Sequence, residues 1–284
     1  MEEKKTIPET QKEEEEEEED WGSKAWKLIT KVREKAPLIQ CITNYVSMDI
    51  MANTLLASGA SPAMLHSINE ISDFTPHVHA LCINIGTLSP DWLPSMKSSA
   101  TLATQLNIPW VLDPVAVSAS DFRLKACLQL VGLKPVVIRG NASEILALST
   151  ASVGSDKLSK INRCGRSSLK SLAQACGAVV AVSGAVDIIT DGKRVVGVHN
   201  GVPMMQRDYA TGCAVTALIA AFLAADPLRP FEATASALSI FGVAGEIGMD
   251  LAKGPASLRM HLIDSLHGLD QKSVFSGVNI TSMP

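Results

Sequence analysis

The sequence is poor in aromatic residues and lacks the two common phosphate-binding loop motifs. Phe, Trp and Tyr make up only 4% of its 284 residues, so a core has to be built mainly from aliphatic and alanine side chains. There is no GxxxxGK[ST] sequence, and no GxGxxG follows a predicted strand. If the protein handles a nucleotide, it does so without either of those loops.

Long apolar runs and paired cysteines are also missing. No run reaches the roughly 20 apolar residues of a membrane-spanning helix, and residues 214–225, which come nearest, predict a buried helix. The six cysteines are scattered without a CxxC pair, which argues against a zinc site or a disulfide framework and favours a reducing compartment. We therefore expect a soluble, cytoplasmic protein with no membrane partner.

Negative charge is concentrated at the N-terminus. The formal net charge is −4, and residues 1–20 hold 11 acidic against 3 basic residues. A block of like charge with nothing apolar to bury predicts a disordered acidic tail, and it is unlike a mitochondrial or plastid transit peptide. The remainder is nearly neutral, so no nucleic-acid partner is expected. We expect one folded domain over residues 21–284.

Short apolar runs alternate with helix-length segments along this domain. Continuous apolar strands are typical of a parallel sheet that is buried on both faces, and the alternation predicts an α/β fold with helices on both faces. Asp191-Gly192 predicts a hairpin and an antiparallel edge late in the sheet, and residues 213–268 are expected to be helical. Predicted strands are 81–85, 110–112, 136–138, 179–182, 186–190 and 195–198, and predicted helices are 24–35, 48–57, 90–106, 142–149 and 167–175.

Residues that follow strands are the first candidates for a site, because ligands of open α/β sheets bind beyond the carboxyl ends of the strands. Asp113 suits a hard cation such as Mg²⁺, although an Asp before Pro also makes an ordinary turn. Arg139 ends another strand, where a guanidinium is costly unless it meets an anion such as phosphate. Ser183 offers a hydroxyl beside the bare backbone of Gly184, where a nucleotide has room to lie close.

Two further residues have both a structural and a functional explanation. Glu144 stands three residues after Asn141, which is the spacing of a helix-capping box, and this explanation competes evenly with a second metal-binding carboxylate. Cys213 follows small residues at the start of the helix predicted over 214–225. The unpaired N–H groups and the dipole of such a terminus favour phosphate and are expected to lower the pKa of the thiol. A buried structural cysteine is the alternative.

In collinear order over residues 24–250, the sequence resembles the hydroxyethylthiazole kinase family of thiamine salvage, which has a ribokinase-like fold. Several collinear stretches are far more specific than any single motif. The stretches that carry the resemblance are Ile42-Thr43-Asn44-Tyr45-Val46, Gly59-Ala60-Ser61-Pro62-Ala63-Met64, Asn84-Ile85-Gly86-Thr87-Leu88, Leu112-Asp113-Pro114-Val115, Ile138-Arg139-Gly140-Asn141-Ala142-Ser143-Glu144-Ile145, Ser183-Gly184-Ala185-Val186-Asp187 and His199-Asn200-Gly201.

The resemblance implies transfer of the γ-phosphoryl group of ATP to the hydroxyl of 4-methyl-5-(2-hydroxyethyl)thiazole. It implies a homotrimer whose sites lie at subunit interfaces. The thiazole would contact Met64 and Ala210, with Asn44 nearby, and ATP would be bound by Arg139 and Ser183. Taken without the resemblance, Met64 has a simpler explanation as a core residue.

The resemblance also implies that Asp113 and Glu144 serve Mg²⁺ and that Gly212 belongs to an anion hole. Cys213 would stand where related sugar kinases have a catalytic Asp. The family usually reads Thr-Gly-Ala-Gly-Cys at this point, whereas this chain has Ala210 in place of the first Gly. Its Cβ either crowds the substrate or tightens the loop.

Other functions remain open on the sequence alone. One is a kinase for another small alcohol such as a hydroxymethylpyrimidine. Another is a catalytically weak ligand-binding relative that has kept the fold, which the altered loop before Cys213 leaves possible. A repair dehydratase on the same fold would need the catalytic Asp that this loop lacks.

Overall fold

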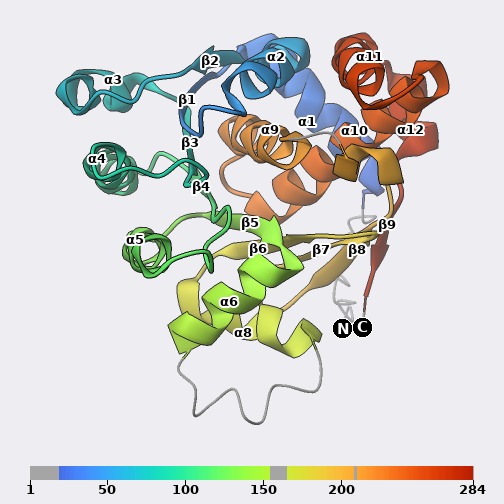
Figure 1. The fold of residues 1–284 in the computed structure, drawn as a ribbon. Coiled ribbons are helices and arrows are strands. Elements are labelled where there is room, and N and C mark those ends of the chain that lie inside the picture. The colour runs from blue at the N-terminus through green and yellow to red at the C-terminus, as the bar shows by residue number, and fades with distance from the viewer. Residues whose placement is uncertain (1–18, 154–164, 208–209, 284) are drawn as a thin grey trace, which may run out of the picture.

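The computed structural model describes residues 19–153, 165–207 and 210–283. In this part of the chain, nine strands form one sheet in the order β2-β1-β3-β4-β5-β6-β7-β8-β9 (Figure 1). Neighbours from β2 to β6 in that order are parallel, and those from β6 to β9 are antiparallel. The strands are β1 (Leu38–Ile42), β2 (Ser61–Ala63), β3 (Ala80–Asn84), β4 (Trp110–Asp113), β5 (Val137–Asn141), β6 (Val179–Ser183), β7 (Asp187–Thr190), β8 (Val195–Val198) and β9 (Ile280–Ser282).

Helices cover both faces of the sheet (Figure 1). One apolar cluster joins one face to α1, α2 and α9 to α12, and a second joins the other face to α3, α4, α5, α6 and α8. The helices are α1 (Trp21–Lys35), α2 (Met48–Ser58), α3 (Ile71–Phe74), α4 (Trp92–Gln105), α5 (Asp121–Val131), α6 (Ala142–Val153), α8 (Gly165–Cys176), α9 (Thr211–Ala225), α10 (Pro230–Leu251), α11 (Pro255–Gly268) and α12 (Gln271–Gly277), with short 3₁₀ turns η1 (Ile68–Glu70), η2 (Thr75–His77) and η3 (Pro203–Arg207).

Helix α9 lies innermost on its face of the sheet, between the strands and its neighbouring helices (Figure 1). Twelve of its 15 residues are buried, and it packs against β1, β3 and β4 as well as α2 and α10. A helix that is apolar all round has to be buried in this way, which confirms the prediction for residues 214–225. None of the helices in the described residues is long and apolar enough to cross a bilayer.

The expected fold class is confirmed, with a largely parallel sheet between two layers of helices. The Asp191-Gly192 hairpin is also confirmed, because β7 and β8 pair antiparallel around it. Strand β1 was not predicted, because Gln40 breaks its apolar run. This side chain is fully buried and accepts a hydrogen bond from Thr75 Oγ1 at 2.8 Å. A polar residue that is hydrogen-bonded in this way can lie in a core strand, although it interrupts the apolar pattern by which such strands are predicted. Strands β2 and β9 and helices α3, α5 and α12 were not predicted either.

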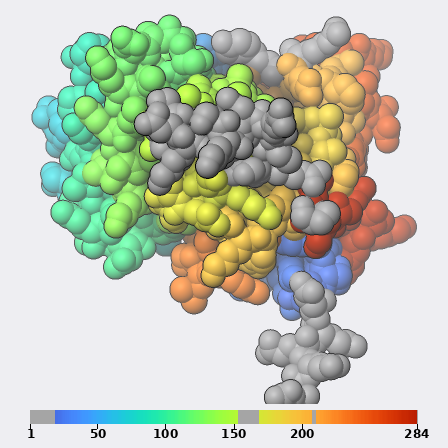
Figure 2. Space-filling model, turned by 90° about the horizontal axis from the view of Figure 1, so that it is seen from below, coloured from blue at the N-terminus to red at the C-terminus, as the bar shows by residue number. Residues whose placement is uncertain are grey.

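The predicted helix 24–35 begins three residues earlier than expected. Asp20 is its N-cap and accepts a hydrogen bond from the backbone N–H of Ser23 at 3.0 Å. Figure 2 shows α1, in blue, beside the red C-terminal part of the chain, and α1 packs against α12. Residues 1–18 of the predicted acidic tail lie outside the described residues, so the domain boundary at Trp21 stays a prediction. Asp20, which was predicted as part of the tail, caps helix α1.

Candidate active site

A cavity of about 520 Å³ opens at the carboxyl ends of the parallel strands, the edge at which open α/β sheets bind ligands. It is bordered by residues that follow β1, β3, β4, β5 and β6, by the start of α9, and by residues 200–206 with the facing side of α10. Of the predicted site residues, those that line it are Asn44, Asp113, Arg139, Glu144, Ser183, Ala210, Gly212 and Cys213.

Met64 is the predicted site residue that does not line this cavity. It follows the short edge strand β2, and its half-buried side chain packs against the core. Within one chain it therefore occupies the position of a core residue, and its predicted contact with the thiazole stays a prediction.

Asn84 ties the buried polar side of the cavity together. Its Nδ2 donates to Asp113 Oδ2 at 2.8 Å and lies 3.2 Å from Cys213 Sγ. Its Oδ1 accepts from Asn44 Nδ2 at 2.9 Å, and Thr216 Oγ1 donates to Asp113 Oδ2 at 2.9 Å. Neither Asn84 nor Thr216 was predicted to have a role. Asn84 ends β3 and could have been found by the strand-end rule, whereas Thr216, one turn into α9, carries no such signal.

Burial controls the ionisation of this cluster. It raises the pKa of Asp113 to about 7, and the Arg139 charge and the donors Thr216 and Asn84 only partly oppose that effect. It also raises the pKa of the Cys213 thiol to about 11, and the nearby Asp113 carboxylate adds to the rise. The expectation of a lowered thiol pKa is therefore wrong. The cost of removing a thiolate from water, next to a carboxylate, exceeds what the helix terminus and the asparagine donors return.

Arg139 and the start of α9 form an anion-binding corner. A guanidinium Nη2 donates to Ser183 Oγ, and a Cβ added at Gly212 would stand 2.7 Å from Nη1. The buried Nε has no hydrogen-bond partner among the described residues. The N-cap, Ala210, has no side-chain atom that could cap α9. The Arg139 guanidinium and the N-terminus of α9 are both positive, so an anion bound between them would be stabilised by both.

Asp187 lies close to this corner and was not assigned a role by the sequence. It begins β7, lines the cavity, and accepts a hydrogen bond from the Gly184 N–H at 2.9 Å. Burial raises its pKa, while the Gly184 N–H and the Arg139 charge act in the opposite direction. The turn between β6 and β7 is thereby fixed beside the anion-binding corner.

Glu144 has the capping-box geometry that its spacing predicts. The Asn141 N–H donates to Oε2 at 2.8 Å, and the Glu144 N–H donates to Asn141 Oδ1 at 3.0 Å. The second oxygen, Oε1, accepts the Ala116 N–H at 2.8 Å. Glu144 therefore holds the start of α6 and the segment after β4 together, and the structural explanation is confirmed. A metal role in addition stays a prediction.

The carboxylates of Asp113 and Glu144 fit a Mg²⁺ site in which phosphate oxygens and water supply most of the ligands. Asp113 and Glu144 both line the cavity, but in the described parts of the chain no three His, Cys, Asp or Glu residues gather as a metal site. In proteins Mg²⁺ is commonly held by one or two carboxylates together with phosphate oxygens and water. Two carboxylates beside an anion-binding corner fit that pattern.

The remaining side of the cavity is mostly apolar. None of its residues was predicted to belong to the site. Val202, Pro203 and Met205 face it from one segment, and Leu238 and Phe241 face it from α10. Apolar residues in a helix and its neighbouring loop look like core in a sequence, and only the fold reveals that they border a cavity.

Comparison with known proteins places the chain among enzymes of one kind. The model of the hydroxyethylthiazole kinase family matches residues 29–272. Hydroxyethylthiazole kinase of Arabidopsis thaliana is 62% identical over 267 residues, which cover 93% of this chain and 97% of that enzyme. The structure of the hydroxyethylthiazole kinase protein from Pyrococcus horikoshii superposes with a TM-score of 0.84 at 36% identity, covering 92% of this chain and 99% of that one. A ribokinase-like protein of Enterococcus faecalis shares the fold, with a TM-score of 0.56 at 13% identity over 89% and 91% of the two chains.

Proposed function

This chain belongs to the hydroxyethylthiazole kinase family, and from that premise we propose how it phosphorylates the hydroxyl of 4-methyl-5-(2-hydroxyethyl)thiazole with ATP in thiamine salvage. The proposal assigns three parts of one cavity to the phosphates, the acceptor and the base of the nucleotide.

The phosphates bind at the corner between Arg139 and the start of α9. The observation that carries this assignment is the guanidinium against Gly212, with a buried Nε that has no partner in the described residues. Phosphoryl transfer has a loose transition state, so positioning and charge stabilisation supply most of the rate. The guanidinium and the N–H groups of the first helical turn act on the charge that develops on the transferred group. Ser183 orients the guanidinium through its hydroxyl.

The acceptor alcohol lies on the Asn44 side of the cavity, between Cys213 and Asp113. The Cys213 thiol has a pKa of about 11, so only its small ionised fraction at neutral pH accepts the proton of the hydroxyl. A loose transition state tolerates this weak base because it requires little activation of the nucleophile. Asn84 and Asn44 hold the thiol and the carboxylate in place. When Mg²⁺ is bound, Asp113 and Glu144 are the residues that would hold it, and it would neutralise phosphate charge.

The base of ATP occupies the apolar side of the cavity, against residues 202–205 and the cavity-facing residues of α10. This side belongs to the same cavity as the anion-binding corner. Its lining is mostly apolar, and an apolar surface suits the faces of a flat heterocycle. The three assignments thus place base, phosphates and acceptor in one order along the cavity.

We further propose a homotrimer with sites completed at subunit interfaces, in the cytoplasm. Tyr45 and Val46 beside the cavity are 69% and 52% exposed, which suits coverage by a second copy, and a neighbouring Met64 would then be available to the thiazole. The five cysteines in the described residues are free, which fits a reducing compartment.

The test is thiazole-dependent formation of ADP, measured with the thiazole alcohol and with a hydroxymethylpyrimidine at equal concentrations. We expect turnover with the thiazole to exceed turnover with the pyrimidine by at least about tenfold, since a pocket that loses well-placed contacts discriminates on this scale. Equal turnover would favour the broader alcohol kinase. Nucleotide binding without turnover would favour the weak ligand-binding relative. Sedimentation at micromolar concentration tests the trimer.

A further inference from the structure

Residues 200–206 form a wall of the cavity that is held from outside the site. We call this segment the base loop. Its Gly201 N–H donates to Glu246 Oε1 at 2.6 Å, and Asn200 Nδ2 lies 3.2 Å from the same oxygen. Glu246 is half-buried on α10 and does not line the cavity itself. One carboxylate on a covering helix therefore fixes the first two residues of the base loop.

Asn200 extends this anchor to the C-terminal part of the chain. Its Oδ1 accepts from Ser239 Oγ at 2.6 Å and from the Asn279 N–H at 2.9 Å, and its Nδ2 donates to the Gly277 carbonyl at 2.8 Å. The side chain is thus fully engaged, with both its oxygen and its amide nitrogen used. Because both ends of the amide are hydrogen-bonded, the side chain has a single orientation. This fixes the position of Asn200 and therefore of the start of the base loop.

The base loop also lies flat against α10, at two glycines. A Cβ at Gly242 would stand 2.5 Å from Asn200 Cβ, and one at Gly245 would stand 2.5 Å from Met205 Sδ. Gly201 has a φ of +112°, which favours glycine. The end of the loop is tied to α9 by the Thr211 hydroxyl, which donates to the Met205 carbonyl at 2.8 Å. These contacts hold the loop against α9 and α10, and Glu246 supplies its carboxylate anchor.

We propose that Glu246 is a positioning residue for nucleotide binding. By fixing Asn200 and Gly201 it holds Val202, Pro203 and Met205 in place as the wall against which the base of ATP packs. The inference rests on the proposed function, since it assigns the base to this side of the cavity. A preformed wall lowers the ordering cost of binding, so loss of the anchor weakens binding of the nucleotide more than it slows the chemical step.

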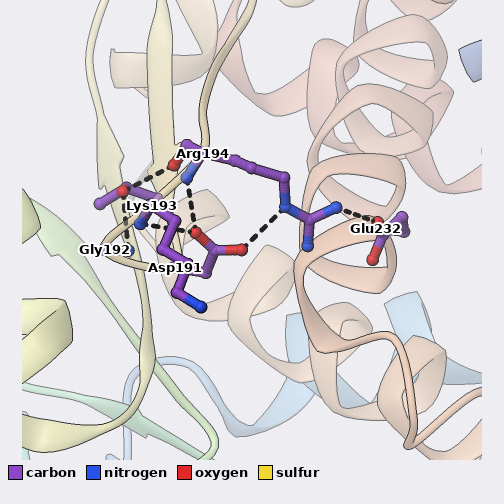
Figure 3. A network of polar contacts seen from close by, with 6 residues as sticks. Asp191, Gly192, Lys193, Arg194 and Glu232 are labelled. Atoms are coloured by element: carbon purple, nitrogen blue, oxygen red, sulfur yellow. Dashed lines mark hydrogen bonds and ion pairs between the residues drawn. The ribbon is translucent and has the colours of Figure 1, made fainter.

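The same helix offers a matched control. Glu232, in the first turn of α10, also makes a charged contact, with Arg194 Nη1 at 2.6 Å. Figure 3 shows Arg194 between Asp191 of the hairpin and Glu232, and none of these residues lines the cavity. Substitution at Glu232 therefore breaks a charged contact of α10 without touching the base loop.

The experiment compares Glu246→Ala and Glu246→Gln with Glu232→Ala and Glu232→Gln. The dissociation constant for ADP is measured by calorimetry, and KM for ATP, KM for the thiazole alcohol, kcat and Tm are measured alongside. We expect Glu246→Ala to raise both the ADP dissociation constant and KM for ATP about tenfold or more, the usual loss for a hydrogen bond to a charged group. KM for the thiazole and kcat should change less than about threefold, which is within the scatter expected for a distant substitution.

Rescue separates positioning from bulk stability. Glu246→Gln keeps an oxygen that accepts the Gly201 N–H, so it should recover most of the nucleotide affinity, and both Glu232 variants should bind ADP like the wild type. Unchanged ADP affinity in a folded Glu246→Ala variant would overturn the inference, as would an equal rise in KM for both substrates. If Glu246→Ala does not fold, the decision rests on Glu246→Met, which keeps the side-chain length but offers no oxygen to the Gly201 N–H: weakened ADP binding supports the inference, and wild-type ADP affinity at a lowered Tm overturns it. Because ADP binding needs no acceptor, this result is independent of whether the thiazole is the substrate.

Discussion

The two walls of the cavity are built in different ways. The strand-end wall consists of polar side chains at the carboxyl ends of parallel strands and at the start of α9, and these side chains hold one another through direct hydrogen bonds. The helix wall consists of the base loop and the facing side of α10, and it is held through backbone N–H groups, carbonyls and glycine contacts. Substitutions in the first wall should therefore change the chemical step, and those in the second should change binding.

The largest effect is expected at Arg139, which serves the phosphates from the strand-end wall. Arg139→Ala should lower kcat/KM by about 10²–10³-fold with a fall in kcat, because a donor to developing charge is lost. Steady-state kinetics at varied ATP measures both parameters. A folded variant in which only KM for ATP rises would show that Arg139 acts like a residue of the helix wall.

Cys213 should give the next largest effect. Cys213→Ala should lower kcat by about 10²-fold, the lower end for loss of a proton acceptor. Only the ionised thiol accepts a proton, and its pKa is about 11, so kcat of the wild type should rise as the pH increases from 7 to 9. This rise should be absent in Cys213→Ala. Identical pH profiles for the two proteins would exclude the thiol as the base.

Asp113 links the strand-end wall to the stability of the protein. Its pKa of about 7 in the folded protein exceeds the ordinary value of 3.8, so the folded state binds the proton more tightly than the unfolded state. Its contribution to the free energy of unfolding is therefore greatest below pH 4 and is lost as the pH rises to 7. Asp113→Asn cannot ionise, so in EDTA its stability relative to the wild type should increase with pH over this window.

Urea unfolding of both proteins at pH 4, 5.5 and 7 provides the measurement. Glu144→Gln is the matched control. It keeps one acceptor oxygen for the capping box and should cost only about 1 kcal/mol at pH 7. A constant stability difference for Asp113→Asn at all three pH values would contradict the raised pKa.

The smallest effect is expected from the N-terminus, which belongs to neither wall. Removal of residues 1–18 should leave kcat and Tm unchanged, since a self-repelling acidic segment has little to bury. Removal of residues 1–20 should cost about 1 kcal/mol, because Asp20 caps α1. Differential scanning calorimetry of the two truncated proteins tests this. A large loss of Tm on removing residues 1–18 alone would show that the tail packs on the domain.

The same division explains what could be read from the sequence. Asp113, Arg139 and Ser183 stand at the ends of apolar strands, where a polar residue is conspicuous and the topology gives it a place in the site. The alternation of strands and helices likewise predicted the layers of the fold. The roles of Glu246 and Asn200 were not predicted, because the two residues are 46 positions apart in the sequence and meet only when residues 200–206 pack against α10. The pKa of Cys213 was misjudged for a related reason. Its burial beside Asp113 depends on the packed fold, which local sequence does not reveal.

Gly212 and Arg139 have a joint consequence for how this site tolerates substitution. With a guanidinium nitrogen 2.7 Å from where a Cβ would stand, even the smallest side chain at position 212 would displace the arginine. In a saturation scan, changes at Gly212 should therefore lower kcat by moving the Arg139 guanidinium, although the two residues lie on different elements. The absence of a side chain at position 212 is thus what gives the guanidinium room to lie against the start of α9.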